Sequence, residues 1–145
     1  MSQKPSNSTS VSCPFNHAYS VGHNVRKHFD WPNVHEVMKK VKEEIQELDE
    51  VLDKTPTEQI HELGDVLFTL VQVARHLNID PKDSLALCNA RHEQRMERMK
   101  LLIQEDGKIF EEQSLEELES YWVKAKNTLK PKEKQMISDY LTKKF

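Results

Sequence analysis

The chain has 145 residues, of which 37% are hydrophobic and 31% are charged, and only three are glycine. This composition favours one helical domain over a sheet protein. The net charge of −3 argues against a general attraction to nucleic acid or membranes, and no apolar run approaches the roughly 20 residues that span a bilayer. Because the polar N-terminus contains no apolar signal-peptide core, a cytoplasmic protein with free thiols at Cys13 and Cys88 is expected.

The beginning of the chain is polar. Residues 1–12 are rich in serine, and we expect them to form a disordered segment. A short leading helix is predicted at about 18–27. The thiol and imidazole groups in this region fit no standard zinc-ligand spacing, which disfavours a zinc site. These groups belong to Cys13, His17, His23 and His28.

Four longer segments have apolar residues at helical spacing. The pattern predicts helices at about 34–52, 57–77, 81–104 and from 114 onward. Asn33 and Ser114 are each followed three residues later by glutamate, an arrangement that caps a helix start, and Thr57 is a candidate cap for the second helix. The lysine-rich residues 131–145 are predicted to form a last short helix or a solvated tail.

The order of helices predicts an all-α domain, which is taken to cover residues 13–130. The break between the first two helices is short, so they are expected to be antiparallel neighbours. The 57–77 helix has apolar residues on more than one face. In a chain of this size a second copy is a natural cover for such a helix, so a homodimer is expected.

Two acidic pairs lie in the first two long helices. Glu44 and Glu47 are three residues apart, as are Glu62 and Asp65, so the carboxylates of each pair share a helix face. Between neighbouring helices roughly 8–10 Å apart, four carboxylates repel one another unless a cation lies among them. Oxygen ligands without a nearby cysteine favour a hard ion such as Mg²⁺ or Mn²⁺.

A solvated surface is the ordinary interpretation of an acidic pair on a helix. The second pair has an unusual context, because it lies in the segment I-H-E-L-G-D-V-L-F-T-L-V, the most apolar helix of the chain. Carboxylates in such a helix are expected to be partly buried and therefore to need partners. This context lowers the weight of the solvated-surface interpretation, and a metal site and a solvated surface both stay open from the residues alone.

From about residue 19 to residue 126 the chain resembles the MazG family of nucleoside triphosphate pyrophosphohydrolases. The resemblance rests on F-D-W-P from Phe29, K-E-E-I-Q-E from Lys42, E-L-G-D from Glu62 and A-R-H-L from Ala74. It continues through Asn89, the segment from Arg91 to Arg95, and W-x-x-x-K from Trp122 to Lys126.

The resemblance implies a helical bundle that is usually an obligate homodimer, with a dimer of dimers as the alternative. It also implies cleavage of a nucleoside triphosphate between the α- and β-phosphates, giving the monophosphate and pyrophosphate. Matching motif positions would make the two acidic pairs ligands of Mg²⁺, with Mn²⁺ as a possible substitute. Residues matching the substrate side of the motif are Asn89, Arg91, Arg95, Trp122 and Lys126.

Two positions depart from the family motif K-F-x-x-R, in which Arg95 is the arginine. Arg91 stands at the lysine and keeps its charge, but its planar group presents a different geometry to a phosphate. His92 stands at the phenylalanine, where a local packing change is favoured over a new catalyst. The loose match before Phe29 leaves the base preference open.

Chemical roles follow for several of these side chains. Lys126, Arg95 and Arg91 would hold the charge of the departing pyrophosphate. Glu43 would orient or deprotonate the attacking water, although a surface glutamate beside two ligands is an equal alternative. Trp31 or Trp122 would stack on the base, with core packing at least as good an interpretation of each.

Three rival functions remain open. A narrower relative of the same superfamily, either a deoxynucleotide pyrophosphatase or a phosphoribosyl-ATP pyrophosphohydrolase, would use the same acidic site. A helical dimer that binds a nucleotide without cleaving it is a rival from another class. A nucleic-acid binder is the weakest rival, because the basic tail lacks interleaved aromatic residues.

Overall fold

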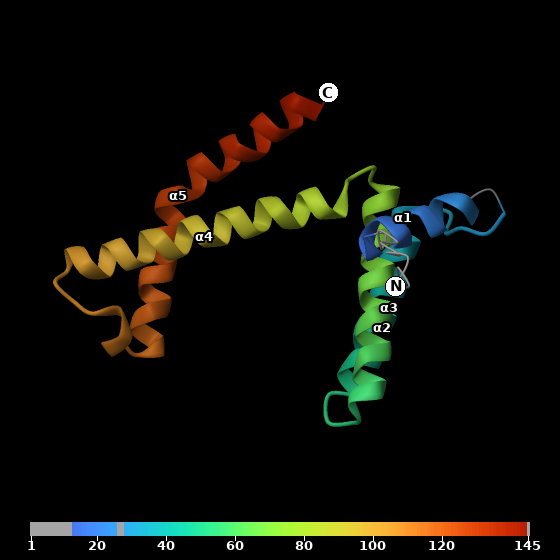
Figure 1. Cartoon of the computed structure of the whole chain (residues 1–145), viewed down its shortest axis with the longest axis horizontal. Helices are drawn as coiled ribbons and strands as arrows, with labels where there is room; N and C mark the ends of the chain where they lie inside the picture. Colours follow the sequence, from blue (N-terminus) through green and yellow to red (C-terminus); the bar gives the residue numbers. More distant parts are fainter. Residues whose placement is uncertain (1–12, 26–27, 145) are drawn as a thin grey trace, which may run out of the picture. The chain divides into compact units, whose positions relative to one another are not determined.

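The computed structural model describes residues 13–25 and 28–144, so the expectation for residues 1–12 lies outside the described residues. The described ranges contain helices and no strand, which confirms the all-α prediction (Figure 1). The elements are α1 (Pro14–Val25), α2 (Val34–Glu50), α3 (Pro56–His76), α4 (Pro81–Glu105), the 3-10 helix η1 (Phe110–Glu112) and α5 (Leu115–Lys144). No helix in the described part of the chain is long and apolar enough to cross a membrane.

The chain divides into two compact units, the first ending at Lys82 and the second beginning at Asp83. In the first unit α2 and α3 form a helical hairpin, and α1 packs against α3. Valines on the facing sides of the hairpin are buried: Val37 and Val41 on α2, and Val66 and Val71 on α3. This hairpin is the antiparallel pair that the short break predicts.

The starts of both hairpin helices are fixed by side-chain caps. The Asn33 side chain accepts a hydrogen bond from the Glu36 amide at 3.1 Å, as predicted. On α3 the cap is Thr55 rather than Thr57, and Glu58 completes a capping box with it. Pro56 is the first helical residue, where its missing amide hydrogen costs no intrahelical bond. The helix therefore begins at Pro56, before the start that a cap at Thr57 would give.

The docking of α1 on α3 depends on a glycine. A Cβ placed on Gly22 would lie 1.8 Å from Oε1 of Gln72 and 2.6 Å from Nε of Arg75. Gln72 is fully buried, and its side-chain amide donates to the Ala18 carbonyl at 2.8 Å. Because no larger residue fits between these groups, Gly22 sets how closely the two helices approach.

A buried ion pair fixes the turn before α2. The Arg75 guanidinium donates to both carboxylate oxygens of Asp30, at 3.0 and 2.7 Å, and His76 lies 3.1 Å from the same carboxylate. The hydrogen bond from Arg75 is the main reason that the pKa of Asp30 falls to about 2. This pair joins the F-D-W-P segment to the end of α3.

The second unit has its own core between α4 and α5. Met99, Ile103, Tyr121 and Ala125 are buried there. Gly107, with φ of 69°, follows the end of α4, because glycine adopts this left-handed conformation without steric cost. The predicted capping box of Ser114 and Glu117 is present at the start of α5, with both bonds at 3.2 Å.

The lysine-rich segment differs from the prediction. It continues α5 as far as Lys144 instead of forming a separate helix or a solvated tail, and Pro131 lies inside the helix. A proline there removes one backbone donor and bends the helix, and Figure 1 shows α5 changing direction along its length. Glu133, two residues later, is buried. Tertiary contact therefore overrides the charge pattern of this segment.

Candidate functional site

Three of the four predicted metal ligands come together across the α2–α3 hairpin. Glu44, Glu47 and Glu62 each offer a carboxylate oxygen, and these oxygens lie within 4.8 Å of one another. The hairpin explains the geometry, because residues 44 and 47 share one face of α2 while residue 62 lies on the facing helix. Glu44 is buried, Glu62 is half-buried and Glu47 is exposed.

Asp65, the fourth predicted ligand, stands outside this close group. Its carboxylate lies 3.3 Å from Nε2 of His61, one turn back on α3. Half of its side chain is exposed, so the contact with His61 uses one oxygen in a solvated setting. Asp65 shares the face of Glu62 by its spacing in the sequence, but its side chain is turned to a different partner.

The electrostatics of the cluster are those of an incompletely neutralised anionic site. Oε2 of Glu44 and Oε2 of Glu62 are buried and have no hydrogen-bond partner among the described residues. The charge of Glu44, followed by a hydrogen bond with it, raises the pKa of Glu47. Buried carboxylate oxygens without partners are costly, and an oxygen-only donor set suits a hard divalent cation. These residues therefore fit a divalent metal.

Lys40 is a member of this region that the sequence interpretation missed. Its ammonium lies 2.8 Å from Glu44 and 3.2 Å from Glu43, and the hydrogen bond to Glu44 is the main cause of its raised pKa. The spacing of three and four residues along α2 could have identified it. Glu43, the candidate general base, is exposed and contacts this lysine.

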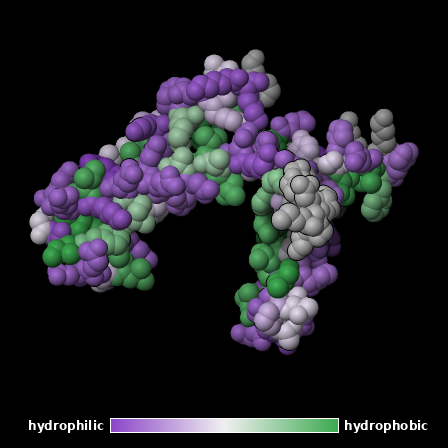
Figure 2. Space-filling view, in the orientation of Figure 1, coloured by the Kyte–Doolittle hydropathy of each residue, from purple (hydrophilic) through white to green (hydrophobic). Residues whose placement is uncertain are grey.

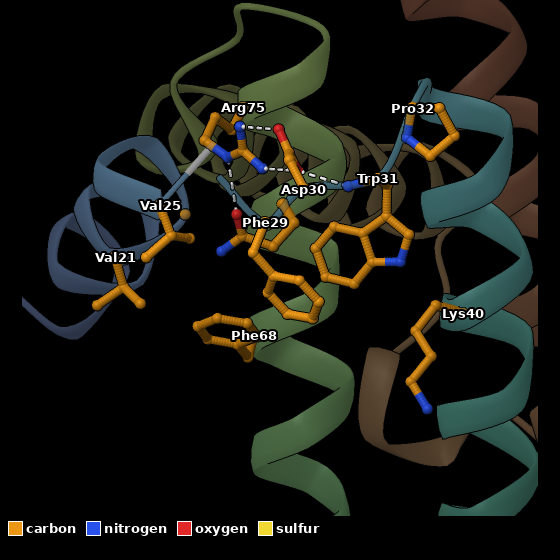
Figure 3. A pocket seen from close by; sticks show the side chains of 11 residues that line it. Val21, Val25, Phe29, Asp30, Trp31, Pro32, Lys40, Phe68 and Arg75 are labelled. Atoms are coloured by element: carbon orange, nitrogen blue, oxygen red, sulfur yellow. Dashed lines mark hydrogen bonds and ion pairs between the residues drawn. The ribbon is translucent and has the colours of Figure 1, made fainter. Parts of the chain in front are cut away.

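A largely apolar cavity of about 490 Å³ lies beside the lysine in the same unit. Figure 3 shows the rings of Phe29, Trp31 and Phe68 gathered along α3, with Lys40 on α2 beyond the Trp31 ring. The Asp30–Arg75 ion pair also lines the cavity and lies at one end of this group of rings. Because Lys40 both lines the cavity and contacts Glu44, the cavity and the carboxylate cluster are adjacent.

The remaining predicted residues belong to the second unit. Trp122 stacks on His92 with ring centroids 5.6 Å apart, and the Arg95 guanidinium lies 6.0 Å from the Trp122 ring. His92 thus makes the packing contact favoured for it. Arg95 also forms a bidentate ion pair with Glu133. The sequence interpretation did not identify Glu133 as a partner of Arg95. Asn89 and Lys126 are exposed on α4 and α5.

Comparison with known proteins connects this geometry to a family. Residues 20–92, half of the chain, match the family model described as phosphoribosyl-ATP pyrophosphohydrolase. The chain belongs to this family. The matched range contains all the carboxylates of the cluster and the residues that line the aromatic cavity.

Curated relatives place the chain with the MazG-type members of the phosphoribosyl-ATP pyrophosphohydrolase family. It is 41% identical over 98 residues to the nucleoside triphosphate pyrophosphohydrolase/pyrophosphatase MazG of Thermotoga maritima. It is 32% identical over 103 residues to the nucleoside triphosphate pyrophosphohydrolase of Escherichia coli. Each match covers 68% of this chain and 38% of the relative, so it spans well under half of either relative. The resemblance seen in the motifs is confirmed.

Proposed function

We propose that this chain is a divalent-cation-dependent nucleoside triphosphate pyrophosphohydrolase. It would cleave between the α- and β-phosphates and release a nucleoside monophosphate and pyrophosphate. One observation carries the proposal, namely the three carboxylates of Glu44, Glu47 and Glu62 gathered within 4.8 Å, two with unpartnered buried oxygens. The names of the two relatives, both nucleoside triphosphate pyrophosphohydrolases, support the reaction class.

Glu44, Glu47 and Glu62 would hold Mg²⁺ or Mn²⁺, and Asp65 would join them by turning away from His61. A bound divalent cation neutralises the polyphosphate and makes a coordinated water more acidic. The motif supports Asp65 because its spacing from Glu62 places it on the same helix face. Its exposed contact with His61 costs little to break, since even exposed ion pairs contribute only about 0–1 kcal/mol.

The protein's own groups would carry out the remaining steps. Glu43 would accept a proton from the attacking water, and its exposure leaves it free to reach solvent. Lys126, Arg95 and Arg91 would bind phosphate oxygens and stabilise the charge of the departing pyrophosphate, with Asn89 and Trp122 contributing to substrate binding. These roles rest on the family motif together with the positive charge of the three cations.

The cavity beside Lys40 would receive the nucleoside. Its volume of about 490 Å³ is within the roughly 300–1,000 Å³ range of small-molecule sites, and its aromatic lining suits a flat base. Stacking on an aromatic side chain such as Trp31 contributes roughly 1–3 kcal/mol per base. Lys40 would then lie at the boundary between the nucleoside and the phosphates bound near Glu44.

Association with a second copy is part of the proposal. Large apolar side chains are exposed along the hairpin, and Figure 2 shows hydrophobic residues gathered along the α3 segment. Among them are Ile60, Leu63, Leu70, Ile45 and Leu52. Burying these groups against an identical surface would remove an apolar patch that monomers rarely expose. Light scattering of the purified chain is expected to give twice the monomer mass or a multiple of it.

A phosphoribosyl-ATP pyrophosphohydrolase is a second candidate, favoured by the description of the matched family model. A substrate panel separates the two candidates. The chain is incubated with Mg²⁺ and ordinary, modified and deoxy triphosphates, or with phosphoribosyl-ATP, and the products are identified. Pyrophosphate and a monophosphate from nucleoside triphosphates support the first proposal. Cleavage of phosphoribosyl-ATP alone supports the second, and nucleotide binding without cleavage contradicts both.

A further inference from the structure

A buried carboxylate lies among the cationic side chains of the second unit. Glu133 is only 5% exposed, and both its oxygens accept hydrogen bonds from Arg95: Nε donates at 2.6 Å and Nη2 donates at 2.8 Å. The hydrogen bond from Arg95 lowers the pKa of Glu133, and the charges of Arg95, Arg91 and Lys126 lower it further. Three of the proposed phosphate-binding residues therefore act on one carboxylate of their own unit.

Helical spacing explains how these groups come together. Arg91 and Arg95 are one turn apart on α4, so they share a face of that helix. Lys126 and Glu133 are seven residues apart on α5, a spacing of about two turns that keeps them near one face of the helix, with the bend at Pro131 between them. The continuation of α5 past Pro131 is what brings the carboxylate to Arg95.

The hydrogen bonds of Arg95 are the kind that a phosphate group makes. A guanidinium binds a carboxylate or a phosphate through two parallel N–H donors, so a phosphate that used the Nε–Nη2 edge of Arg95 would compete with Glu133 for it. Near this pair, Nε of Arg91 is buried and has no hydrogen-bond partner in the part of the chain that the structure describes. The cationic cluster thus has one edge occupied by Glu133 and one buried donor that is not satisfied.

We propose that Glu133 is an internal counter-ion of a polyphosphate-binding site formed by Arg91, Arg95 and Lys126, and that it sets the affinity of that site. A polyphosphate must displace Glu133 from the Nε–Nη2 edge of Arg95 or bind against its negative charge. The C-terminal part of α5 thereby becomes a determinant of substrate affinity. The proposal rests on the phosphate-binding role given above to these cations, but its test does not require hydrolysis.

A structural role for Glu133 predicts the opposite effect. If Glu133 only holds Arg95 in place, removal of its charge frees the guanidinium and weakens phosphate binding. If it competes with phosphate, removal of the charge strengthens binding, because the same three cations then act on the ligand without an internal anion. The direction of the change therefore separates the two roles.

The test measures tripolyphosphate binding to the full chain by titration calorimetry without divalent ions and at fixed ionic strength. Glu133→Gln is expected to bind at least about tenfold more tightly than the unmodified chain, because one charge-assisted competitor is removed. Glu119→Gln is the matched control, since Glu119 is exposed on the same helix, and it is expected to leave the affinity unchanged. Equal or weaker binding by Glu133→Gln overturns the proposal, as does a lack of tripolyphosphate binding by the unmodified chain and the variant.

Two further variants keep the test decisive. In a chain that already carries Arg95→Ala, the added substitution Glu133→Gln is expected to tighten binding by a clearly smaller factor than in the unmodified chain, because the competition for Arg95 is gone and only the charge on Arg91 and Lys126 is relieved. An equal factor in both backgrounds overturns the direct competition at Arg95. Circular dichroism shows whether each variant remains helical. If Glu133→Gln loses its helicity, Glu133→Asp is measured instead. Its shorter side chain reaches Arg95 less well, so binding is expected to tighten by a smaller factor, and unchanged or weaker binding overturns the proposal.

The outcome is separate from that of the proposed activity. Pyrophosphate release from nucleoside triphosphates is measured on the same preparations with Mg²⁺. Tighter tripolyphosphate binding by Glu133→Gln without any hydrolysis by the unmodified chain supports the counter-ion and contradicts the enzymatic proposal. Hydrolysis by the unmodified chain without tighter binding by the variant supports the enzymatic proposal and contradicts the counter-ion.

Discussion

The two units of this protein differ in how their clustered charges are neutralised. On the α2–α3 hairpin three carboxylates come together, and two of them keep buried oxygens without a hydrogen-bond partner among the residues described. In the second unit, the cation Arg95 is neutralised by Glu133 from the same unit. On the hairpin Lys40 contacts one oxygen of Glu44, and carboxylate charge is left over that an added cation would neutralise. The second unit supplies an anion of its own to Arg95.

This difference predicts which of the two charged clusters responds to a cation and which to an anion. Unpartnered buried carboxylates are stabilised by any divalent ion that reaches them, because burial makes their charge expensive. A cation already paired with an internal carboxylate gains less from an added anion, since the existing pair must be broken or shared. Metal should therefore act mainly on the first unit, and removal of one internal charge should act mainly on the second.

The largest expected effect comes from Glu44, the buried member of the proposed ligand set. Glu44→Gln keeps the size of the side chain but removes the charge. The rate of hydrolysis is expected to fall by at least about a hundredfold, because loss of a residue that only supports a metal ligand already lowers activity by about 10–100-fold. Pyrophosphate release measures the effect, and circular dichroism is expected to show unchanged helicity. Full activity at ordinary Mg²⁺ would remove Glu44 from the ligand set.

The next effect concerns the docking of α1. Gly22→Ala places a methyl group against Gln72 and Arg75, and the variant is expected to lose about 1–3 kcal/mol of unfolding free energy, as overpacked interiors do. Urea unfolding measures the loss. Gly64→Ala is the matched control, because a Cβ at residue 64 has no neighbour within 4 Å and alanine favours the helix. Equal stability of both variants would contradict the close approach of α1 to α3.

A smaller kinetic effect is expected in the second unit. Lys126→Ala removes one exposed cation and is expected to raise KM and lower kcat, with kcat/KM falling by about tenfold, which corresponds to about 1.4 kcal/mol of transition-state binding. Steady-state kinetics of pyrophosphate release measure the change. Lys130→Ala, also exposed on α5, serves as the control. An unchanged kcat/KM for Lys126→Ala would exclude a phosphate-binding role.

The smallest effect is a pH dependence of stability at the F-D-W-P turn. Because Arg75 lowers the pKa of Asp30 to about 2, the ionised pair stabilises the fold above the ordinary carboxyl pKa, and this stabilisation is lost as the pH falls from about 4 to about 2. After allowance for solvent screening the loss is on the order of 1 kcal/mol. Urea unfolding of the unmodified chain and of Asp30→Asn over this range measures it. An equal pH dependence in both would contradict the contribution of this pair.

Local features were the most accessible from the sequence. The helices, the Asn33 cap and the Ser114 capping box follow from residues within a few positions of one another, and the structure contains them. The convergence of three acidic residues also follows, because a short loop leaves the two helices of a hairpin few ways to pair. Family motifs could not settle the roles of these residues, which remain proposals.

Features that depend on contacts between distant segments were missed. The tail pattern is that of a solvated helix, yet Glu133 is buried because Arg95, 38 residues earlier, provides a partner for its charge. Nothing in the sequence around Gly22 marks it, and its importance is visible only when the buried side chain of Gln72 lies against it. Asp65 shares a face with Glu62, but helical spacing does not determine the rotamer that pairs it with His61.

The most direct test of the central claim is a Mn²⁺ titration of the full chain followed by electron paramagnetic resonance. We predict that the chain binds Mn²⁺ and that Glu62→Gln weakens this binding by at least about tenfold, because one carboxylate ligand is lost. Asp49→Asn, at an exposed residue of α2, is expected to leave the affinity unchanged. Equal Mn²⁺ affinity in the unmodified chain and in Glu62→Gln, or no binding by the unmodified chain, would contradict a metal site between α2 and α3.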